Sequence, residues 1–255
     1  MRIVRFNYKK NSGWGILESA VVRVFQNSPF SSLKLTKQTV PFKKISLLVP
    51  AIPNKIILVG LNYLDHAREL KMSLPQEPVI FLKPNSALIA HKKKIIFPLH
   101  ATRVDFEAEL ALVIKKKAKN VAPEDAKKYI LGYTCLNDVT ERGLQKKDGQ
   151  WTRAKSFDTF CPLGPWVETE VNPADLSVRS YLNRKLKQDA STRNLIFSVD
   201  KLVSFISGVM TLLPGDVIST GTPSGVGPMQ PGDTVCVEIE GIGRLSNRVC
   251  SFPKI

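Results

Sequence analysis

The sequence predicts an α+β protein that is mostly β, and three observations support this fold class. Short runs rich in β-branched and aromatic residues recur along the whole chain, separated by Gly, Pro and Asn turns. Few segments carry the periodicity of an amphipathic helix. The strict strand and helix alternation of a Rossmann-type fold is missing. The chain is also long enough, at 255 residues with 43% hydrophobic side chains, to bury a sizeable core.

The first 50 residues predict a small β-rich domain. The runs 2–6, 14–19 and 20–26 favour strands and are separated by polar turns, which is typical of a meander. Two prolines in the stretch 47–55 interrupt regular structure and indicate a linker. We therefore expect one domain over residues 1–50 and a larger one over residues 51–255.

The larger domain should begin with a buried strand, followed by a helix. The run 55–60 is apolar from Ile56 up to Gly60, and the stretch 62–72 contains helix formers with Asn62 or Asp65 as possible caps. Further strands are expected at 78–84, 104–114 and 130–136, and a short helix at 121–130 with Pro123 in its first turn.

The second half of the chain is again dominated by strands. The stretch 151–165 is basic and rich in hydroxyls, so we expect a loop there. The main helix of this half should start at Ser198 and end before Pro214. A strand and a Gly and Pro loop follow over 215–228, and two alternating strands over 233–252.

Charge and cysteine usage restrict the function classes. The net charge is +15, from 37 basic and 22 acidic residues, and it would suit nucleic acid or small anions. The basic runs at 91–95, 114–120 and 145–149 are not interleaved with aromatics, so solvated lysines are the preferred interpretation and a nucleic-acid or other anion-binding module is the alternative. The four cysteines show no C-x-x-C spacing, which indicates reduced thiols.

The chain shows no targeting or membrane signal. No apolar run approaches the roughly 20 residues of a membrane span. The first residues, MRIVRFNYKK, lack the apolar centre of a secretion signal. We expect a cytoplasmic location and no membrane contact.

An acidic row in the stretch VDFEAEL, residues 104–110, is the first candidate for chemistry. Side chains alternate along a strand, so Asp105, Glu107 and Glu109 share one face. Either this face is a solvated edge, or it holds something positive. Asp138 ends an apolar strand and offers a third carboxylate beside Glu107 and Glu109, and such an all-oxygen site suits Mg²⁺, Mn²⁺ or Ca²⁺ better than Zn²⁺.

Two further groups could take part in catalysis. His66 and Glu69 are three residues apart in a predicted helix, where the carboxylate could orient the imidazole as a general base. A surface pair is the alternative. Lys155 could bind a substrate carboxylate or stabilise an oxyanion. The Gly-rich stretch 219–228 lacks the phosphate-loop, G-x-G-x-x-G and nucleophile-elbow patterns, so it indicates at most a substrate-binding loop.

Taken in order, six segments resemble the fumarylacetoacetate hydrolase family. They read ILVGLNYLDHAREL, PVIFLKP, VDFEAELALVI, GYTCLNDVTER, WTRAKSFDTFCPLGP and GDVISTGTPSGVGPMQPGD, and they span residues 56–233. The resemblance implies a mixed β-roll core with a flattened, barrel-like set of strands, a small N-terminal domain and a homodimer.

The resemblance also implies roles for individual residues. Glu107, Glu109 and Asp138 match the family's divalent-metal carboxylates, while Asp105 resembles a position that is not a ligand. His66 and Glu69 match the family's catalytic histidine and glutamate dyad, and Lys155 matches its active-site lysine. The predicted helix that carries His66 resembles a lid segment. Substrate-contacting positions correspond to Arg142, Gln145 and Thr222.

These residues suggest one mechanism with several outcomes. A 2-oxo acid would chelate the metal, which would stabilise an enolate. Our leading hypothesis is a divalent-metal-dependent hydrolase of acylpyruvate or fumarylpyruvate-type compounds, with Mg²⁺, or else Mn²⁺ or Ca²⁺, as the metal and water activated by His66 and Glu69. The alternatives are a 2-hydroxyhepta-2,4-diene-1,7-dioate isomerase and an oxaloacetate decarboxylase or tautomerase. The positive net charge suits small anionic 2-oxo acids in each case.

Overall fold

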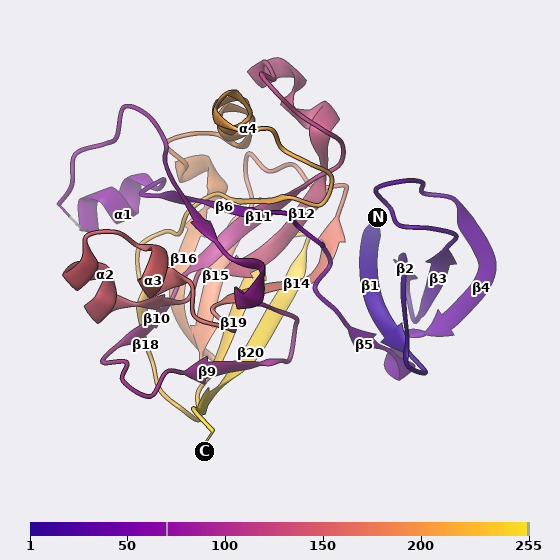
Figure 1. The fold of residues 1–255 in the computed structure, drawn as a ribbon, viewed down its shortest axis with the longest axis horizontal. Coiled ribbons are helices and arrows are strands. Elements are labelled where there is room, and N and C mark those ends of the chain that lie inside the picture. Colours follow the sequence, from indigo (N-terminus) through magenta and orange to yellow (C-terminus); the bar gives the residue numbers. More distant parts are fainter. Residues whose placement is uncertain (70, 254–255) are drawn as a thin grey trace.

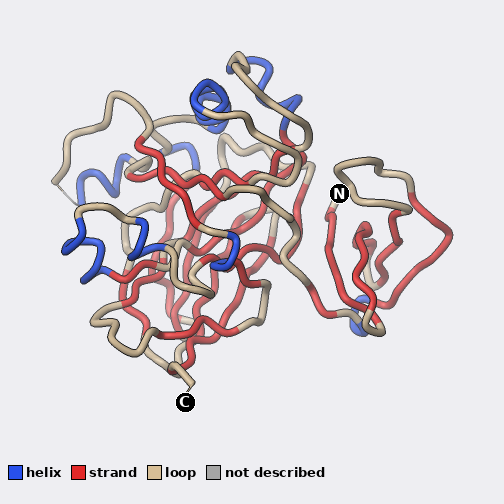
Figure 2. Tube along the Cα trace, in the orientation of Figure 1, coloured by secondary structure: helices blue, strands red, loops and turns tan. Residues whose placement is uncertain are grey.

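The computed structural model describes residues 1–69 and 71–253, and it is mostly β as predicted. Figure 1 shows two units: a small group of strands near the N-terminus and a larger body that contains all four α-helices. Figure 2 shows how strands fill the centre of the larger body while helices and loops lie around it.

The N-terminal unit is a meander, as its sequence pattern indicated. Neighbouring strands pair antiparallel in the order β4-β3-β2-β1. The register of β1 with β14 places Ile3 opposite Val167, so the meander continues the large sheet of the main body. Its elements are β1 (Arg2–Tyr8), β2 (Asn11–Glu18), β3 (Val21–Phe25), β4 (Leu35–Pro41), η1 (Phe42–Lys44) and β5 (Ser46–Leu47).

The large sheet contains twelve strands and carries the site elements of the main body. Its path runs β4-β3-β2-β1-β14-β12-β11-β17-β6-β7, with β5 paired to β1 and β8 to β14. The strands of the main body in this sheet are β6 (Ile56–Gly60), β7 (Val79–Lys83), β8 (Leu88–Ile89), β11 (Ala108–Ile114), β12 (Ile130–Asn137), β14 (Cys161–Glu168) and β17 (Val217–Ser219).

Two smaller sheets complete the β structure. A three-stranded sheet has the order β13-β10-β18, and a five-stranded sheet has the order β16-β15-β19-β20-β9. Their strands are β9 (Lys94–Phe97), β10 (Val104–Phe106), β13 (Thr140–Glu141), β15 (Ser177–Leu182), β16 (Lys185–Ser191), β18 (Gly227–Met229), β19 (Thr234–Ile239) and β20 (Gly243–Ser251).

The expected strand at 104–114 is in fact two strands that belong to different sheets. β10 pairs with β13 and β18, whereas β11 pairs with β12 and β17. Glu107 lies between β10 and β11 at this crossing. The chain therefore passes from the three-stranded sheet to the large sheet at Glu107, one of the three acidic residues of the stretch VDFEAEL.

The helices differ from the predictions in length and number. α1 (Leu64–Glu69) is shorter than the expected 62–72, of which residue 70 lies outside the described residues. The predicted helix at 121–130 is a 3-10 helix, η3 (Pro123–Tyr129). Two further 3-10 turns are η2 (Asn85–Ala87) and η4 (Thr192–Asn194). α4 (Val199–Val209) begins after Ser198, whose side chain accepts a hydrogen bond from the Lys201 amide, as the sequence predicted.

The expected loop at 151–165 was wrong, because this stretch contains α3 (Thr152–Lys155) and then β14. The helix α2 (Arg142–Asp148) was not predicted from the sequence. The Glu141 carboxylate caps α2 by accepting a bond from the Leu144 amide, and Gly149 ends the helix in a left-handed conformation with φ of 68°. Glutamate is not among the preferred N-cap residues, so the start of this helix carries no clear sequence signal.

The main core lies between β11, β12 and α4. It includes Leu112, Tyr133, Leu202 and Ile206, and Leu112 is fully buried. Apolar residues of α4 thus cover one face of the large sheet, where Figure 1 shows this helix above β6, β11 and β12. All four cysteines are free, and Cys135 and Cys161 are buried, as expected for reduced thiols. Within residues 1–69 and 71–253, no helix is long and apolar enough to cross a membrane.

Replacing Leu112 by alanine should reduce the free energy of unfolding by about 2–5 kcal/mol, because it leaves a cavity in the main core. Urea unfolding followed by fluorescence measures this change. Leu99→Ala is the matched control, since the Leu99 side chain is 71% exposed and its truncation should change stability by no more than about 0.5 kcal/mol. Equal effects of the two substitutions would contradict this description of the core.

Candidate active site

The acidic row faces the interior, so the alternative of a solvated edge is wrong. Asp105, Glu107 and Glu109 are at most 5% exposed, and Asp138 is fully buried. One carboxylate oxygen from each of Glu107, Glu109 and Asp138 lies within 4.8 Å of the others. We call these three residues the acidic trio. Their positions follow from the strands: Glu107 and Glu109 flank the start of β11, and Asp138 follows the end of its neighbour β12.

The spacing of the acidic trio fits a divalent cation. Two oxygens that bind one ion at roughly 2.0–2.6 Å can be at most about 4–5 Å apart, which agrees with the observed spacing. The Ser219 hydroxyl and the Gly221 amide both donate to Oε2 of Glu109, so the Oε1 atom lies outside both bonds. The donors are carboxylate oxygens only, which favours Mg²⁺, Mn²⁺ or Ca²⁺. The trio could therefore hold such an ion.

The charges around the trio explain why three acids can be buried together. Burial and repulsion from Asp138 and Glu107 raise the pKa of Glu109 well above its usual value. Burial acts in the same direction on Glu107, but attraction to Lys155 and Arg142 outweighs it and holds the pKa of Glu107 well below its usual range. The pKa values of the two glutamates thus shift in opposite directions, because Glu107 forms ion pairs with Lys155 and Arg142, whereas the weaker attraction of Lys155 for Glu109 does not offset burial and repulsion.

Lys155 is the central cation of the site. Its ammonium donates to Oε2 of Glu107 at 3.0 Å and also to Asp138. Burial would lower its pKa, but attraction to Asp138 and Glu107 outweighs burial, so the pKa lies above its usual value. Lys155 is thus placed as a hydrogen-bond donor between these two carboxylates. α3 places it there, and the Lys155 amide bonds to the Trp151 carbonyl.

Arg142 and Gln145 lie on α2 and face the same site. The Arg142 guanidinium donates to Glu107, to Asp105 through Nε at 2.9 Å, and to Gln145 through Nη1 at 2.8 Å. Asp105 also accepts two bonds from Arg103. Asp105 thus holds two arginines in place and does not belong to the acidic trio.

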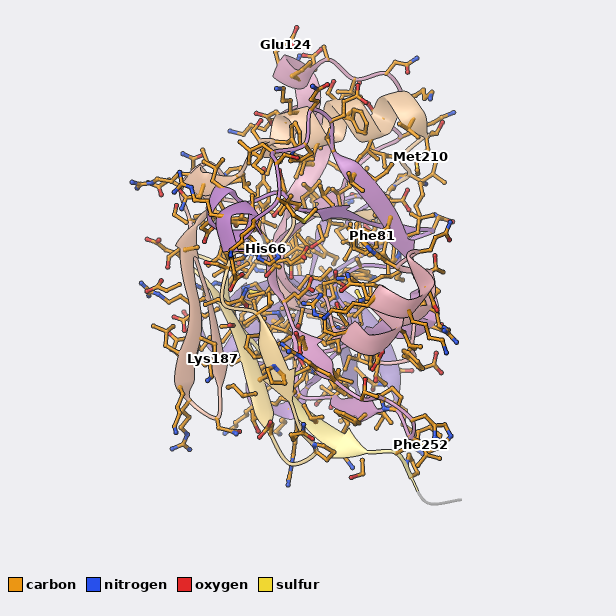
Figure 3. All side chains as sticks on the ribbon, turned by 90° about the vertical axis from the view of Figure 1, so that its left-hand side faces the viewer. His66, Phe81, Glu124, Lys187, Met210 and Phe252 are labelled. Atoms are coloured by element: carbon orange, nitrogen blue, oxygen red, sulfur yellow. The ribbon has the colours of Figure 1, made fainter. Side chains whose placement is uncertain are left out.

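The proposed dyad lies on α1. His66 Nδ1 is 2.8 Å from Oε2 of Glu69, and the Gly225 amide donates to the other carboxylate oxygen of Glu69. The His66 side chain is 11% exposed and Glu69 is 41% exposed. Since Nδ1 of His66 is engaged by the carboxylate, Nε2 is the ring nitrogen available to a substrate. Figure 3 labels His66 and Phe81 of β7 on this side of the molecule, and both residues line the same pocket.

A pocket of about 500 Å³ brings these groups together. Of the residues predicted from the sequence, all but Glu69 line it: His66, Glu107, Glu109, Asp138, Arg142, Gln145, Lys155 and Thr222. The Thr222 hydroxyl is fixed because it donates to the Ala108 carbonyl and accepts from Gln188. The pocket has the size of a small-molecule site.

Several residues that bond to the acidic trio or line the pocket were not predicted from the sequence. Lys83 is 2% exposed and donates to Asp138 and to the Val139 carbonyl. Phe81 and Trp151 form an apolar part of the pocket wall. Lysine and aromatic residues are common in strands and loops, so their presence in the sequence does not indicate a site. The role of Lys83 becomes visible only through its bond to Asp138 in the folded structure.

Family models match both units of the chain. The model described as fumarylacetoacetate (FAA) hydrolase C-terminal matches residues 55–250, and the model described as Rv2993c-like, N-terminal, matches residues 1–50. Among characterised sequences, a mitochondrial oxaloacetate tautomerase of Xenopus laevis is 42% identical over 232 residues, which cover 86% of this chain and 73% of the relative.

Solved structures of similar proteins share the whole fold. A 5-carboxymethyl-2-hydroxymuconate delta-isomerase from Mycobacterium smegmatis is 43% identical with a TM-score of 0.94, covering 99% of this chain and 100% of that one. A 2-hydroxyhepta-2,4-diene-1,7-dioate isomerase from Mycobacterium marinum is 44% identical with a TM-score of 0.93, covering all of both chains. A maleylpyruvate hydrolase from a Sphingobium species, in complex with manganese(II) and pyruvate, is 31% identical with a TM-score of 0.83, covering 99% and 100%.

Replacing Lys83 by methionine should reduce the free energy of unfolding by about 3–5 kcal/mol, because it removes one partner of a buried ion pair with Asp138. Thermal and urea unfolding in metal-free buffer measure the loss. Lys187→Met removes an exposed lysine and serves as the control. If Lys83→Met were as stable as the control, the charge compensation described for Asp138 would be wrong.

Proposed function

The chain belongs to the fumarylacetoacetate hydrolase family, and we propose that it is a divalent-metal-dependent enzyme that converts a small 2-oxo acid through its enolate. One observation carries the proposal: the buried acidic trio lies in a pocket that also presents Lys155, Arg142 and His66. A divalent cation, Mg²⁺ in our proposal, would bind the carboxylate and keto oxygens of the substrate and stabilise the negative charge of the enolate.

The side chains divide the remaining tasks. Lys155 is buried and protonated, so it donates to oxygen atoms on which negative charge develops. Arg142 and Gln145 bind and orient a substrate carboxylate from α2. Thr222 contacts the substrate from the opposite loop. His66 moves the proton through Nε2, while Glu69 fixes the ring and stabilises its protonated form.

We favour proton transfer alone, that is tautomerisation or isomerisation, as the outcome. The relatives named as an oxaloacetate tautomerase and as isomerases are 42–44% identical to this chain, whereas the maleylpyruvate hydrolase is 31% identical. Proton transfer needs only one base beside the enolate, and His66 supplies it. The substrates would be small 2-oxo dicarboxylates such as oxaloacetate, or 2-hydroxydienedioates.

Carbon–carbon hydrolysis is the second candidate, and the exposure of the dyad favours it. Glu69 is 41% exposed while it contacts His66, so water can reach the pair. His66 would take a proton from water, the resulting hydroxide would attack the acyl carbonyl, and the bond to the pyruvyl carbon would break. The products would be a carboxylic acid and the enolate of pyruvate, which is then protonated. Acylpyruvate and fumarylpyruvate-type acids are the substrates of this outcome.

The homodimer and the cytoplasmic location stay predictions. The homodimer rests on the resemblance alone. Nucleic acid stays an unfavoured partner on the sequence pattern alone, because the basic runs are not interleaved with aromatic residues.

We expect the purified protein to convert the enol form of oxaloacetate to the keto form in a magnesium-dependent reaction, because the enolate needs a cation at the acidic trio. Loss of enol absorbance measures the rate, with and without EDTA and after magnesium is restored. Parallel assays test a hydroxyheptadienedioate, acetylpyruvate and fumarylpyruvate, with released pyruvate detected by lactate dehydrogenase and released carbon dioxide as the signal of decarboxylation. Identical rates with and without EDTA would contradict the proposal.

His66→Asn supplies the matched test of the acid–base step. It should lower kcat by roughly 10²- to 10⁴-fold on the preferred substrate. His100→Asn alters an exposed histidine outside the pocket and should leave the rate unchanged. An unaffected kcat in His66→Asn would remove the dyad from the mechanism.

A further inference from the structure

A pair of aromatic side chains separates the substrate pocket from a second cavity. The second cavity, about 560 Å³, lies beside β7 and is lined by apolar residues that include Val79, Leu82 and Met210. Phe81 and Trp151 line both cavities. Their rings are 5.2 Å apart at 80°, an edge-to-face packing that favours a fixed arrangement.

Gly60 fixes where the indole of Trp151 lies. A Cβ atom at Gly60 would be 2.3 Å from Cζ3 and 2.5 Å from Cη2 of the indole, so the ring occupies the space that any other side chain would need. Gly60 ends β6, the strand that pairs with β7, and Trp151 immediately precedes α3. We call Phe81 and Trp151 together the aromatic wall. The position of Trp151 in this wall is determined by its contact with Gly60, where the end of β6 meets the start of α3.

The wall adjoins the reacting groups. The Lys155 ammonium lies 5.1 Å from the centre of the Phe81 ring, and it bonds directly to Glu107 and Asp138. Three further cations of the pocket lie away from β7: Arg103 directly precedes β10, and Arg142 and Lys146 lie on α2. The pocket therefore has a charged side for carboxylates and an apolar side for the rest of the substrate.

We propose that Trp151, backed by Gly60 and paired with Phe81, sets the upper size of the group at the far end of the substrate. This inference rests on the proposed function and makes it narrower. The protein accepts 2-oxo acids with a compact far end, and it rejects those with a ring there because the indole occupies the path into the second cavity. Trp151 is a specificity-determining residue, and the chemistry is carried by other side chains.

Trp151→Ala should join the two cavities and admit a phenyl group. The probes are pyruvate and phenylpyruvate, two 2-oxo acids that differ by one ring, titrated calorimetrically into the protein with magnesium. We expect the affinity for phenylpyruvate relative to pyruvate to rise by roughly tenfold to hundredfold in Trp151→Ala. Pyruvate affinity should change less than about threefold. Trp151→Phe should give a smaller change in the same direction.

Two further variants distinguish a specific effect of Trp151 on ligand size from a general loss of structure. Met210→Ala enlarges only the second cavity and should leave the preference unchanged. Gly60→Ala should shift the preference like Trp151→Ala, because its new methyl group displaces the indole. A folded Trp151→Ala that loses both ligands equally, or gains none for phenylpyruvate, would overturn the proposal.

An error in the proposed function would be seen in the wild-type protein, and it can be told apart from an error in the role of Trp151. If the wild-type protein neither binds pyruvate with magnesium nor converts any 2-oxo acid, the proposed function is wrong, whatever Trp151 does. The crystal structure of Trp151→Ala then decides the wall independently of any ligand. One continuous cavity would support the wall, and two cavities that stay separate would overturn it.

Discussion

Three carboxyl groups are buried side by side in this protein, and the surrounding strands, helices and cations are arranged around them. Glu107, Glu109 and Asp138 bring their oxygens within 4.8 Å of one another in the interior, where unpaired charge is very unfavourable. Lys83, Lys155 and Arg142 reach Glu107 and Asp138 and offset part of that cost. Glu109 receives only neutral donors, and its raised pKa marks the place where positive charge is most needed.

The sheet topology produces this concentration of charge. The chain leaves the three-stranded sheet after β10 and enters the large sheet at β11, and Glu107 lies at the crossing. Antiparallel pairing of β11 with β12 places Ala108 opposite Asn137, so Asp138 follows directly beside Glu107. Asn137 Oδ1 accepts the Glu107 amide, and the Asp138 amide donates to the Glu107 carbonyl, so the backbone is satisfied at the crossing. α2 and α3 then bring Arg142 and Lys155 to the same point.

The sequence predicted much of this site, because alternation along a strand is a robust signal. The shared face of Glu107 and Glu109 and the pairing of His66 with Glu69 follow from the periodicities of strand and helix. The order of the six family-like segments added Asp138, Arg142 and Lys155. Lys83 could not be predicted, since its role depends on Asp138, 55 residues away in the chain. α2 and α3 were missed because their caps are unusual, and the crossing at Glu107 was missed because two strands in sequence read as one.

Binding of one divalent cation by the acidic trio can be measured by calorimetric titration of Mn²⁺ into the metal-free protein. We expect one ion per chain for the wild type and an affinity lower by at least about tenfold in Glu109→Gln, while Glu124→Gln, which alters an exposed acid outside the pocket, should bind like the wild type. Absence of binding by the wild type, or equal affinity in Glu109→Gln, would show that the trio is not a metal site.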